Sequence, residues 1–325
     1  MSELMRCVTI YPPMLDIVIH TERSSLLEMG LAANTIVGFS ENKHCKIRAE
    51  VERQIAAGDK HVRFKAGGAT FNTQKILSQC MECDFFGIVG EDSNGAIISE
   101  QMKGTQVNIH LDKSKQVATP WAYVFISGDE RTILAKQDPS ASYSAYAKEQ
   151  IMGRIDQATV FYCVSFTFFL EKVSGVTFEI LEQKKEKGFC SILNLSSEEI
   201  VGNFKKEILR AAGMCDFIIG NKLEYFELFG ATDEARLLVW LDSLKVGYAI
   251  TDGPSTVYGR IPGGPLRQVT PPYVSDEINT SGAGDSFASG FIRAMKDRTF
   301  AATLDIAPLL SEGVRASNAH IRSSG

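Results

Sequence analysis

The sequence predicts an α/β fold with a central, mainly parallel β-sheet flanked by helices and a small β lid. In the second half of the chain, short apolar runs alternate with long amphipathic stretches, which is the pattern of βαβ units. In the first half, β-rich runs occur without such regular helices. With 325 residues, 44% of them apolar, the chain is long enough for one large domain.

Four parallel strands are expected in the second half, at residues 159–165, 189–195, 215–220 and 247–251. The intervening stretches are long enough to be crossover helices that cover the sheet, at residues 171–187, 198–212 and 232–245. Asn194, Asn221 and Thr251 fall at or just beyond the carboxyl ends of these strands. Open α/β sheets bind ligands at that rim.

Further strands are expected in the first half, at residues 7–11, 14–20, 84–89, 121–127 and 131–135. The segment 127–130 (SGDE) is typical of a hairpin turn between the last two. We expect these strands to form a lid over the ligand rim, from discontinuous segments at approximately 16–37 and 110–137. Because no linker, low-complexity tract or repeat divides the sequence, residues 1–325 are expected to form a single domain.

Composition argues against several classes of protein. The net charge is -5 and no sustained basic run occurs, which argues against nucleic-acid binding. The apolar stretch 161–170 is too short to span a bilayer, and residues 1–6 lack a signal-peptide pattern. The seven scattered cysteines are expected to be reduced. Cys80 and Cys83 form a lone C-x-x-C, for which a structural role is favoured over zinc or redox chemistry. We therefore expect a cytoplasmic protein with small-molecule partners.

The run 279–285 (NTSGAGD) places small residues and one carboxylate at the start of an apolar helical segment. Gly282, Ala283 and Gly284 have almost no side chain, so their backbone N–H groups can approach a phosphate at the helix N-terminus. Asp285, in the first turn, would be well placed to accept a proton from a substrate hydroxyl. The alternative is an ordinary glycine-rich loop followed by an acidic residue, which is favourable in any first helical turn.

A second cluster of small residues, 66–72 (AGGATFN), precedes a helical stretch expected at 73–79. Gly67 and Gly68 permit close approach of the backbone to a ligand, and Asn72 offers donors and acceptors to a sugar hydroxyl. A structural turn is the alternative.

Together, in this order and separation, the two runs resemble the two signatures of the ribokinase-like (PfkB) carbohydrate kinase family. Segments 221–224 (NKLE), 251–253 (TDG) and 87–92 (GIVGED) resemble its N-x-x-E, T-x-G and G-x-x-G-x-D motifs. Within the family, segments 13–17 (PMLDI), 128–131 (GDER) and 194–196 (NLS) are most similar to the adenosine kinases. The likeness spans almost the whole chain. No G-x-x-x-x-G-K-[ST] motif occurs, so a P-loop kinase is not expected.

The resemblance implies transfer of the γ-phosphoryl group of ATP to the 5′-hydroxyl of adenosine, giving AMP and ADP in purine salvage. It implies that Asp285 is the general base and that residues 282–284 form the anion hole. Arg131 matches a lid arginine that would reach the transferring phosphate, with a solvated hairpin arginine as the alternative. Asp16 resembles the carboxylate that binds the 2′- and 3′-hydroxyls of ribose, and Gly67, Gly68 and Asn72 would complete ribose binding.

For the nucleotide and metal, the resemblance implies that Asn221 and Glu224 help to organise Mg²⁺, through water because magnesium keeps much of its hydration shell. An ordinary surface pair, one helical turn apart, is the alternative. Thr251 and Gly253 resemble part of the nucleotide-binding rim. We expect a monomer, with pairing through an exposed edge of the lid sheet as the alternative.

The sequence also departs from the family pattern. Asn279 stands where the family usually has Asp, which argues against activation by a monovalent cation, and Pro12 stands where adenosine kinases commonly have Asn. Gln137, Thr167 and Glu199 fall near positions that hold bulky apolar side chains around the base. These departures leave two alternatives: a kinase for another nucleoside or sugar, or a non-catalytic nucleoside-binding homologue. The C-terminal region, which binds adenine in the family, looks abbreviated; Asn318 and His320 lie there, with ordinary helix-surface positions as the alternative.

Overall fold

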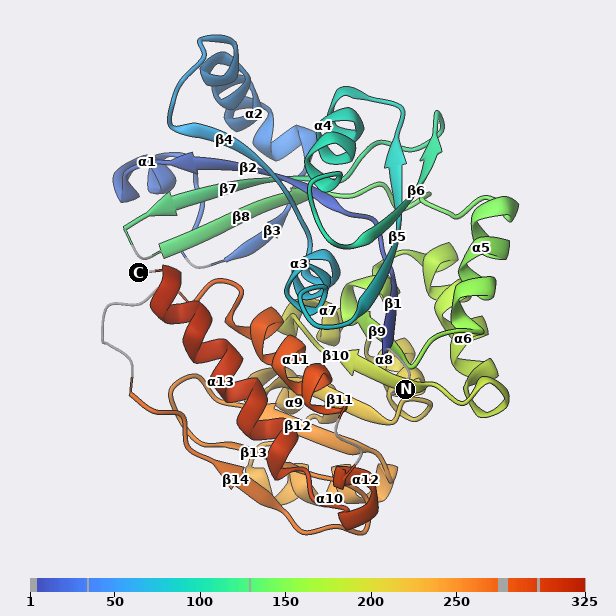
Figure 1. The fold of residues 1–325 in the computed structure, drawn as a ribbon. Helices are drawn as coiled ribbons and strands as arrows, with labels where there is room; N and C mark the ends of the chain where they lie inside the picture. Colours follow the sequence, from blue (N-terminus) through green and yellow to red (C-terminus); the bar gives the residue numbers. More distant parts are fainter. Residues whose placement is uncertain (1–4, 34, 129, 274–279, 297–298, 325) are drawn as a thin grey trace.

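The computed structural model describes residues 5–33, 35–128, 130–273, 280–296 and 299–324. Within these ranges the strands form two sheets (Figure 1). The larger sheet is parallel except at β13 and β14. Its strand order is β14 (Arg267–Val269), β13 (Val257–Arg260), β12 (Gly247–Thr251), β11 (Phe217–Asn221), β10 (Cys190–Asn194), β9 (Val160–Val164), β1 (Arg6–Ile10), β5 (Glu82–Gly90) and β6 (Asn108–Ser114).

Helices cover both faces of this sheet, so its central strands are continuous apolar runs; in β9 every residue is buried. One face packs against α3 (Ala69–Leu77), α11 (Ala283–Ala294) and α13 (Ala307–Ser324). The other face packs against α5 (Ala145–Ile155), α6 (Glu171–Lys187), α7 (Glu198–Asn203), α8 (Lys205–Ala212), α9 (Lys222–Phe229) and α10 (Glu234–Leu244). The fold is therefore the predicted α/β class.

The smaller sheet lies over the carboxyl ends of the strands of the larger sheet (Figure 1). Its strand order is β3 (Ile36–Gly38), β8 (Glu130–Lys136), β7 (Trp121–Ser127), β2 (Met14–His20) and β4 (Val62–Gly67). Helices α2 (Glu41–Ala56) and α4 (Ser93–Met102) lie on its outer side. The remaining short helices are α1 (Arg23–Glu28), η1 (Ser165–Phe169) and α12 (Thr299–Thr303).

Comparison with the expected elements shows close agreement for β2, β7, β12 and α6, whose bounds match the prediction. Two expected helices differ. The helix expected at 198–212 is divided into α7 and α8 because Phe204 leaves the helical region (φ -121, ψ 31). The helix expected at 73–79 begins earlier, at Ala69, so Asn72 lies within its first turn. Not all of the strands expected in the lid lie in the smaller sheet: β1, β5 and β6 belong to the larger sheet. The smaller sheet instead includes β4, which was not expected.

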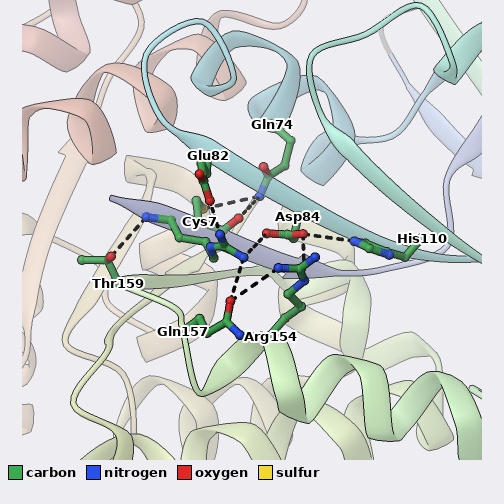
Figure 2. A network of polar contacts seen from close by, with 9 residues as sticks. Cys7, Gln74, Glu82, Asp84, His110, Arg154, Gln157 and Thr159 are labelled. Atoms are coloured by element: carbon green, nitrogen blue, oxygen red, sulfur yellow. Dashed lines mark hydrogen bonds and ion pairs between the residues drawn. The ribbon is translucent and has the colours of Figure 1, made fainter. Parts of the chain in front are cut away.

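A buried ionic cluster ties β1, β5, β6 and α5 together at the amino ends of the strands (Figure 2). Asp84, whose side chain is fully buried, lies 3.4 Å from Nη1 of Arg6, 3.3 Å from Nε of Arg154 and 3.0 Å from Nε2 of His110. The His110 ring also stacks on Phe86, with centroids 4.4 Å apart. This cluster lies at the end of the strands away from the rim expected to bind ligands.

All seven cysteines are unpaired, Cys80 and Cys83 included. In the described part of the chain, no helix combines the length and apolar character that crossing a bilayer requires.

Candidate active site

A cavity of about 420 Å³ lies between the carboxyl ends of the larger sheet and the inner face of the smaller one. Most of the predicted site residues line it, although they come from distant parts of the chain: Asp16, Gly68, Asn72, Arg131, Asn221, Glu224, Thr251, Gly282, Gly284 and Asp285. Three predicted residues do not line the cavity. Gly67 and Ala283 are adjacent in sequence to lining residues, and Gly253 lies two residues after Thr251.

The loop before α11 turns through Gly282, whose φ of +83° is a left-handed conformation that favours glycine. The next residue, Ala283, uses its N–H to donate to the carbonyl oxygen of Thr280 at 3.0 Å. The N–H groups of Gly284 and Asp285 have no such partner among the described residues. They therefore point to an anion-binding helix N-terminus, whereas the N–H of Ala283 is already engaged with Thr280 in this conformation.

Asp285 is the carboxylate nearest this helix N-terminus. Its Oδ2 accepts a hydrogen bond from Nδ2 of Asn72 at 3.4 Å, which joins α11 to α3. Burial raises the pKa of the Asp285 carboxyl to about 7, against the lowering effects of the Asn72 amide and the charges of Arg131 and Lys75. A carboxyl with a pKa near 7 can exchange a proton at neutral pH, as a general base must.

Asp16 faces the same cavity from β2. Burial raises the pKa of its carboxyl, and the charges of Arg131, Lys65 and Lys75 oppose that rise. Arg131 reaches the cavity from β8, two strands away in the smaller sheet. This guanidinium thus acts electrostatically on both cavity carboxylates, Asp16 and Asp285.

Asn221 and Glu224 form a reciprocal capping box at the start of α9. Oδ1 of Asn221 accepts from the backbone N–H of Glu224, and Oε2 of Glu224 accepts from the backbone N–H of Asn221, both at 2.8 Å. Glu224 is only 6% exposed, and burial raises the pKa of its carboxyl to about 7. The surface-pair alternative is therefore wrong, because Glu224 is buried beside the cavity.

The predicted magnesium site offers few protein ligands. No group of three or more His, Cys, Asp or Glu gathers in a metal-binding arrangement within the ranges that the structure describes. Oε2 of Glu224 is used in the capping box, whereas Oε1 has no partner there. The donor set therefore fits a hydrated Mg²⁺ held through water rather than a cage of protein ligands.

Tyr11 lines the cavity and Lys75 acts on Asp285 from beside it, and the motifs point to neither residue. The hydroxyl of Tyr11, at the end of β1, lies 2.8 Å from Nε2 and 3.1 Å from Oε1 of Gln137. Lys75 lies one turn after Asn72 on α3, and burial lowers the pKa of its ammonium group. A lysine three residues after the asparagine of a predicted helix could have been noted from the sequence, whereas the Tyr11–Gln137 pair could not.

The departures from the family pattern have different outcomes. Gln137 lines the cavity, whereas Thr167 is fully buried and Glu199 is exposed on α7, so neither lines it. His320 is not a free helix-surface residue, because its Nε2 lies 2.7 Å from the carbonyl oxygen of Ser281. Asn279 lies outside the described residues.

A cavity between a large, mainly parallel sheet and a small sheet, with a helix N-terminus and a buried carboxylate inside, defines a ribokinase-like phosphotransferase. The chain belongs to the pfkB family carbohydrate kinases, whose domain matches residues 28–325. It is therefore a kinase, and membership of this family implies ATP as co-substrate. Asp16 lies outside the matched residues.

The chain is also similar to individual kinases. Adenosine kinase 2 from Arabidopsis thaliana is 24% identical, with 96% of this chain and 92% of that protein covered. Probable fructokinase-4 from the same plant is 27% identical, with 78% and 79% covered. The solved structure of adenosine kinase from Schistosoma mansoni in complex with 2-fluoroadenosine has a TM-score of 0.82, 21% identity and coverage of 98% and 96%. At this identity the structural likeness shows the fold.

Proposed function

We propose that this kinase transfers the γ-phosphoryl group of ATP to the 5′-hydroxyl of adenosine, giving AMP and ADP. One observation carries the proposal: two carboxylates line the same cavity, Asp16 from β2 of the smaller sheet and Asp285 from the first turn of α11. Asp16 would bind a cis-diol and Asp285 would meet the hydroxyl that is phosphorylated. A ribonucleoside carries both groups. The adenosine kinases among the relatives favour adenosine as that nucleoside.

In this proposal Asp285 removes the proton from the 5′-hydroxyl as the phosphoryl group arrives. The N–H groups at the start of α11 would neutralise the charge on the phosphoryl oxygens. Arg131 would approach the same oxygens from the smaller sheet, which we propose to be a lid built largely from segments 16–37 and 110–137. Gly67, Gly68 and Asn72 would shape the ribose site.

Glu224 and Asn221 would hold the hydration shell of Mg²⁺ near the phosphates. The ion would supply positive charge that offsets the charge of the transferring group. Thr251, at the end of β12, and Gly253, in a left-handed turn just beyond it (φ +54), would form part of the nucleotide rim. We also propose a monomer in the cytoplasm, where unpaired cysteines are the rule.

A second candidate is a kinase for another nucleoside or a sugar. Gln137 favours this candidate because it brings a half-buried amide, together with the Tyr11 hydroxyl, into the cavity, and polar groups in a pocket select substrates that satisfy their hydrogen bonds. The fructokinase relative agrees with the same reading.

The test is an assay of ATP-dependent phosphorylation with adenosine, inosine, guanosine, ribose and fructose in the presence of Mg²⁺, for the native chain and for Asp285→Asn. AMP formation that prevails over the other products and falls about 10²–10⁴-fold in the variant supports the proposal. Preferential turnover of inosine or a sugar would replace adenosine by the second candidate. Adenosine binding in calorimetry without any turnover would favour a non-catalytic homologue.

A further inference from the structure

A second cavity, of about 390 Å³, lies on the outer side of the smaller sheet. Helices α2 and α4 form its walls and strands β2, β4 and β7 form its floor, in the upper part of Figure 1. Its volume falls within the range of small-molecule sites in proteins, about 300–1,000 Å³. The lining residues include Ile17, Arg48, Glu52, Phe64, Trp121 and Tyr123.

This cavity is separate from the candidate active site because the sheet lies between them. Side chains alternate between the two faces of a strand. On β7, Trp121 and Tyr123 line the outer cavity, whereas Ala122 lines the active site. On β2, Ile17 and Asp16 are divided in the same way. A molecule in the outer cavity would therefore contact the sheet from behind the active site.

Two polar groups on the floor lack partners. Tyr123 is only 3% exposed, yet its hydroxyl makes no hydrogen bond with any described residue. The indole N–H of Trp121 is likewise without an acceptor in the described part of the chain. Neither atom is sealed from solvent, and Trp121 is only half-buried, so a ligand in the cavity can supply the acceptors that the protein does not. Burial also raises the pKa of the Tyr123 hydroxyl to about 12, so it stays a hydrogen-bond donor at neutral pH.

The floor supplies aromatic surface, and the walls supply no net positive charge. The rings of Trp121 and Tyr123 lie 4.5 Å apart, and Phe39 packs edge-on against Trp121 at 5.0 Å. Arg48 is already paired with Glu52 and with Glu41, each at 2.8 Å. Its charge is thus balanced within the protein, which leaves no unpaired cation here to attract an anion.

We propose that this outer cavity binds a neutral, planar heteroaromatic molecule of about bicyclic size, whose ring nitrogen or carbonyl accepts from Tyr123 and Trp121. An aromatic floor suits a planar ring, and donors on that floor without a protein partner suit a ring that carries acceptors rather than a hydrocarbon. The proposal does not depend on which substrate the kinase phosphorylates.

The sequence offers a clean fluorescence test, because it contains two tryptophans and the second, Trp240, is 53% exposed on α10. In Trp240→Phe, emission reports on Trp121 alone. We would titrate this variant with benzimidazole, and with indane as a carbocycle of similar shape without an acceptor. The expected result is a saturable change with benzimidazole and binding weaker by roughly tenfold with indane, as loss of one or two hydrogen bonds implies.

Two further arms make the test decisive. Tyr123→Phe in the Trp240→Phe background removes one hydroxyl and keeps the ring, so benzimidazole should bind several-fold more weakly while indane is unaffected. Saturating adenosine should leave the benzimidazole titration unchanged. Equal binding of benzimidazole and indane, absence of a saturable change, or displacement of benzimidazole by adenosine would each overturn the proposal.

Discussion

Gly67 lies directly against Asp16: a Cβ atom built on Gly67 would stand 2.5 Å from Oδ2 of that carboxylate. The two residues are on paired strands, with Met14 opposite Gly67 and Asp16 opposite Lys65. Glycine at this position leaves room for the carboxylate beside the backbone of β4. The role of Gly67 is therefore steric, since it does not line the cavity itself.

Gly67→Ala should consequently displace the Asp16 carboxylate and weaken nucleoside binding. Loss of hydrogen bonds to a charged group costs about 1.5–3 kcal/mol, so KM for the nucleoside should rise about 10- to 100-fold with a smaller effect on kcat. The matched control is Gly153→Ala in α5, where an added Cβ meets nothing within 4 Å. Steady-state kinetics on both variants test this, and an unchanged KM in Gly67→Ala would show that Asp16 does not need this space.

The proposed general base should give the reaction a characteristic pH dependence. Because the pKa of Asp285 is about 7, kcat/KM should rise with pH through about 7 and level off above 8. Asn72→Ala removes the amide that lowers this pKa, so its rising limb should move to higher pH. The profile is measured with a substrate whose own groups do not titrate in this range. A flat profile from pH 5.5 to 8.5 would argue against Asp285 as the base.

The same raised pKa predicts a cost in stability. In the unfolded chain this carboxyl has its ordinary pKa of 3.8. Between pH 4 and 7 the folded state thus binds more protons than the unfolded state, and the contribution of Asp285 to stability falls as pH rises. At pH 8, Asp285→Asn should raise the free energy of unfolding by on the order of 1 kcal/mol, which corresponds to a few degrees in Tm. At pH 5 the increase should be smaller. Calorimetry at both values tests this, and a lower Tm in the variant at pH 8 would contradict it.

Arg131 should affect both kcat and the pH profile, because its charge acts on the carboxylates of Asp16 and Asp285. Arg131→Gln should lower kcat about 10²–10³-fold, as loss of one stabilising donor does elsewhere, and should move the pH profile upward because the pKa of Asp285 loses an opposing charge. Lys136→Gln is the control, since Lys136 lies on the same strand but pairs with Glu41 at 2.8 Å, outside the cavity. Equal effects of the two substitutions would show that Arg131 has no special role.

The cluster around Asp84 should contribute stability without contributing chemistry. Asp84→Asn removes the buried charge that faces Arg6 and Arg154 (Figure 2). Breaking a fully buried pair costs about 3–5 kcal/mol, and the loss here should be smaller because Arg6 keeps its pair with Glu82 and Arg154 is partly exposed. Glu41→Gln is the control and should leave the urea midpoint close to the native value, because its ion pairs are exposed to solvent. Urea unfolding measures both. Well below the Tm, kcat of Asp84→Asn should match the native value, and a large loss of kcat there would indicate coupling along the strands to the active site.

Strong periodicity made some elements predictable and others not. The bounds of β12 and α6 follow from the sequence, because β12 is an apolar run and α6 ends at Gly188, a glycine in a left-handed conformation. β4 was missed because Arg63 and Lys65 alternate with Phe64 on a half-exposed strand, so no apolar run marks it. The division at Phe204 was missed as well, because the amphipathic pattern continues through a residue whose conformation depends on packing, here against Phe169 at 6.0 Å.

The candidate site was predictable where a motif carries the chemistry. Glycine-rich runs required by backbone approach located Gly68, Gly282 and Asp285, and all three line the cavity. Gln137 and Tyr11 meet only through the pairing of distant segments, 126 residues apart, so their contact could not be read from either neighbourhood. The role of Gly67 depends on strand register, which the sequence does not reveal until β2 and β4 are known to pair.

Asn72 and Asp285 are 213 residues apart in the chain, and this separation sets when the site can exist during synthesis. A ribosome must complete more than 280 residues before the asparagine meets its carboxylate. Until then a nascent chain can have β2 and β4 in place and still lack the group proposed to activate the hydroxyl. Contacts of such long range also slow folding, so activity should emerge late, after most of the secondary structure has formed.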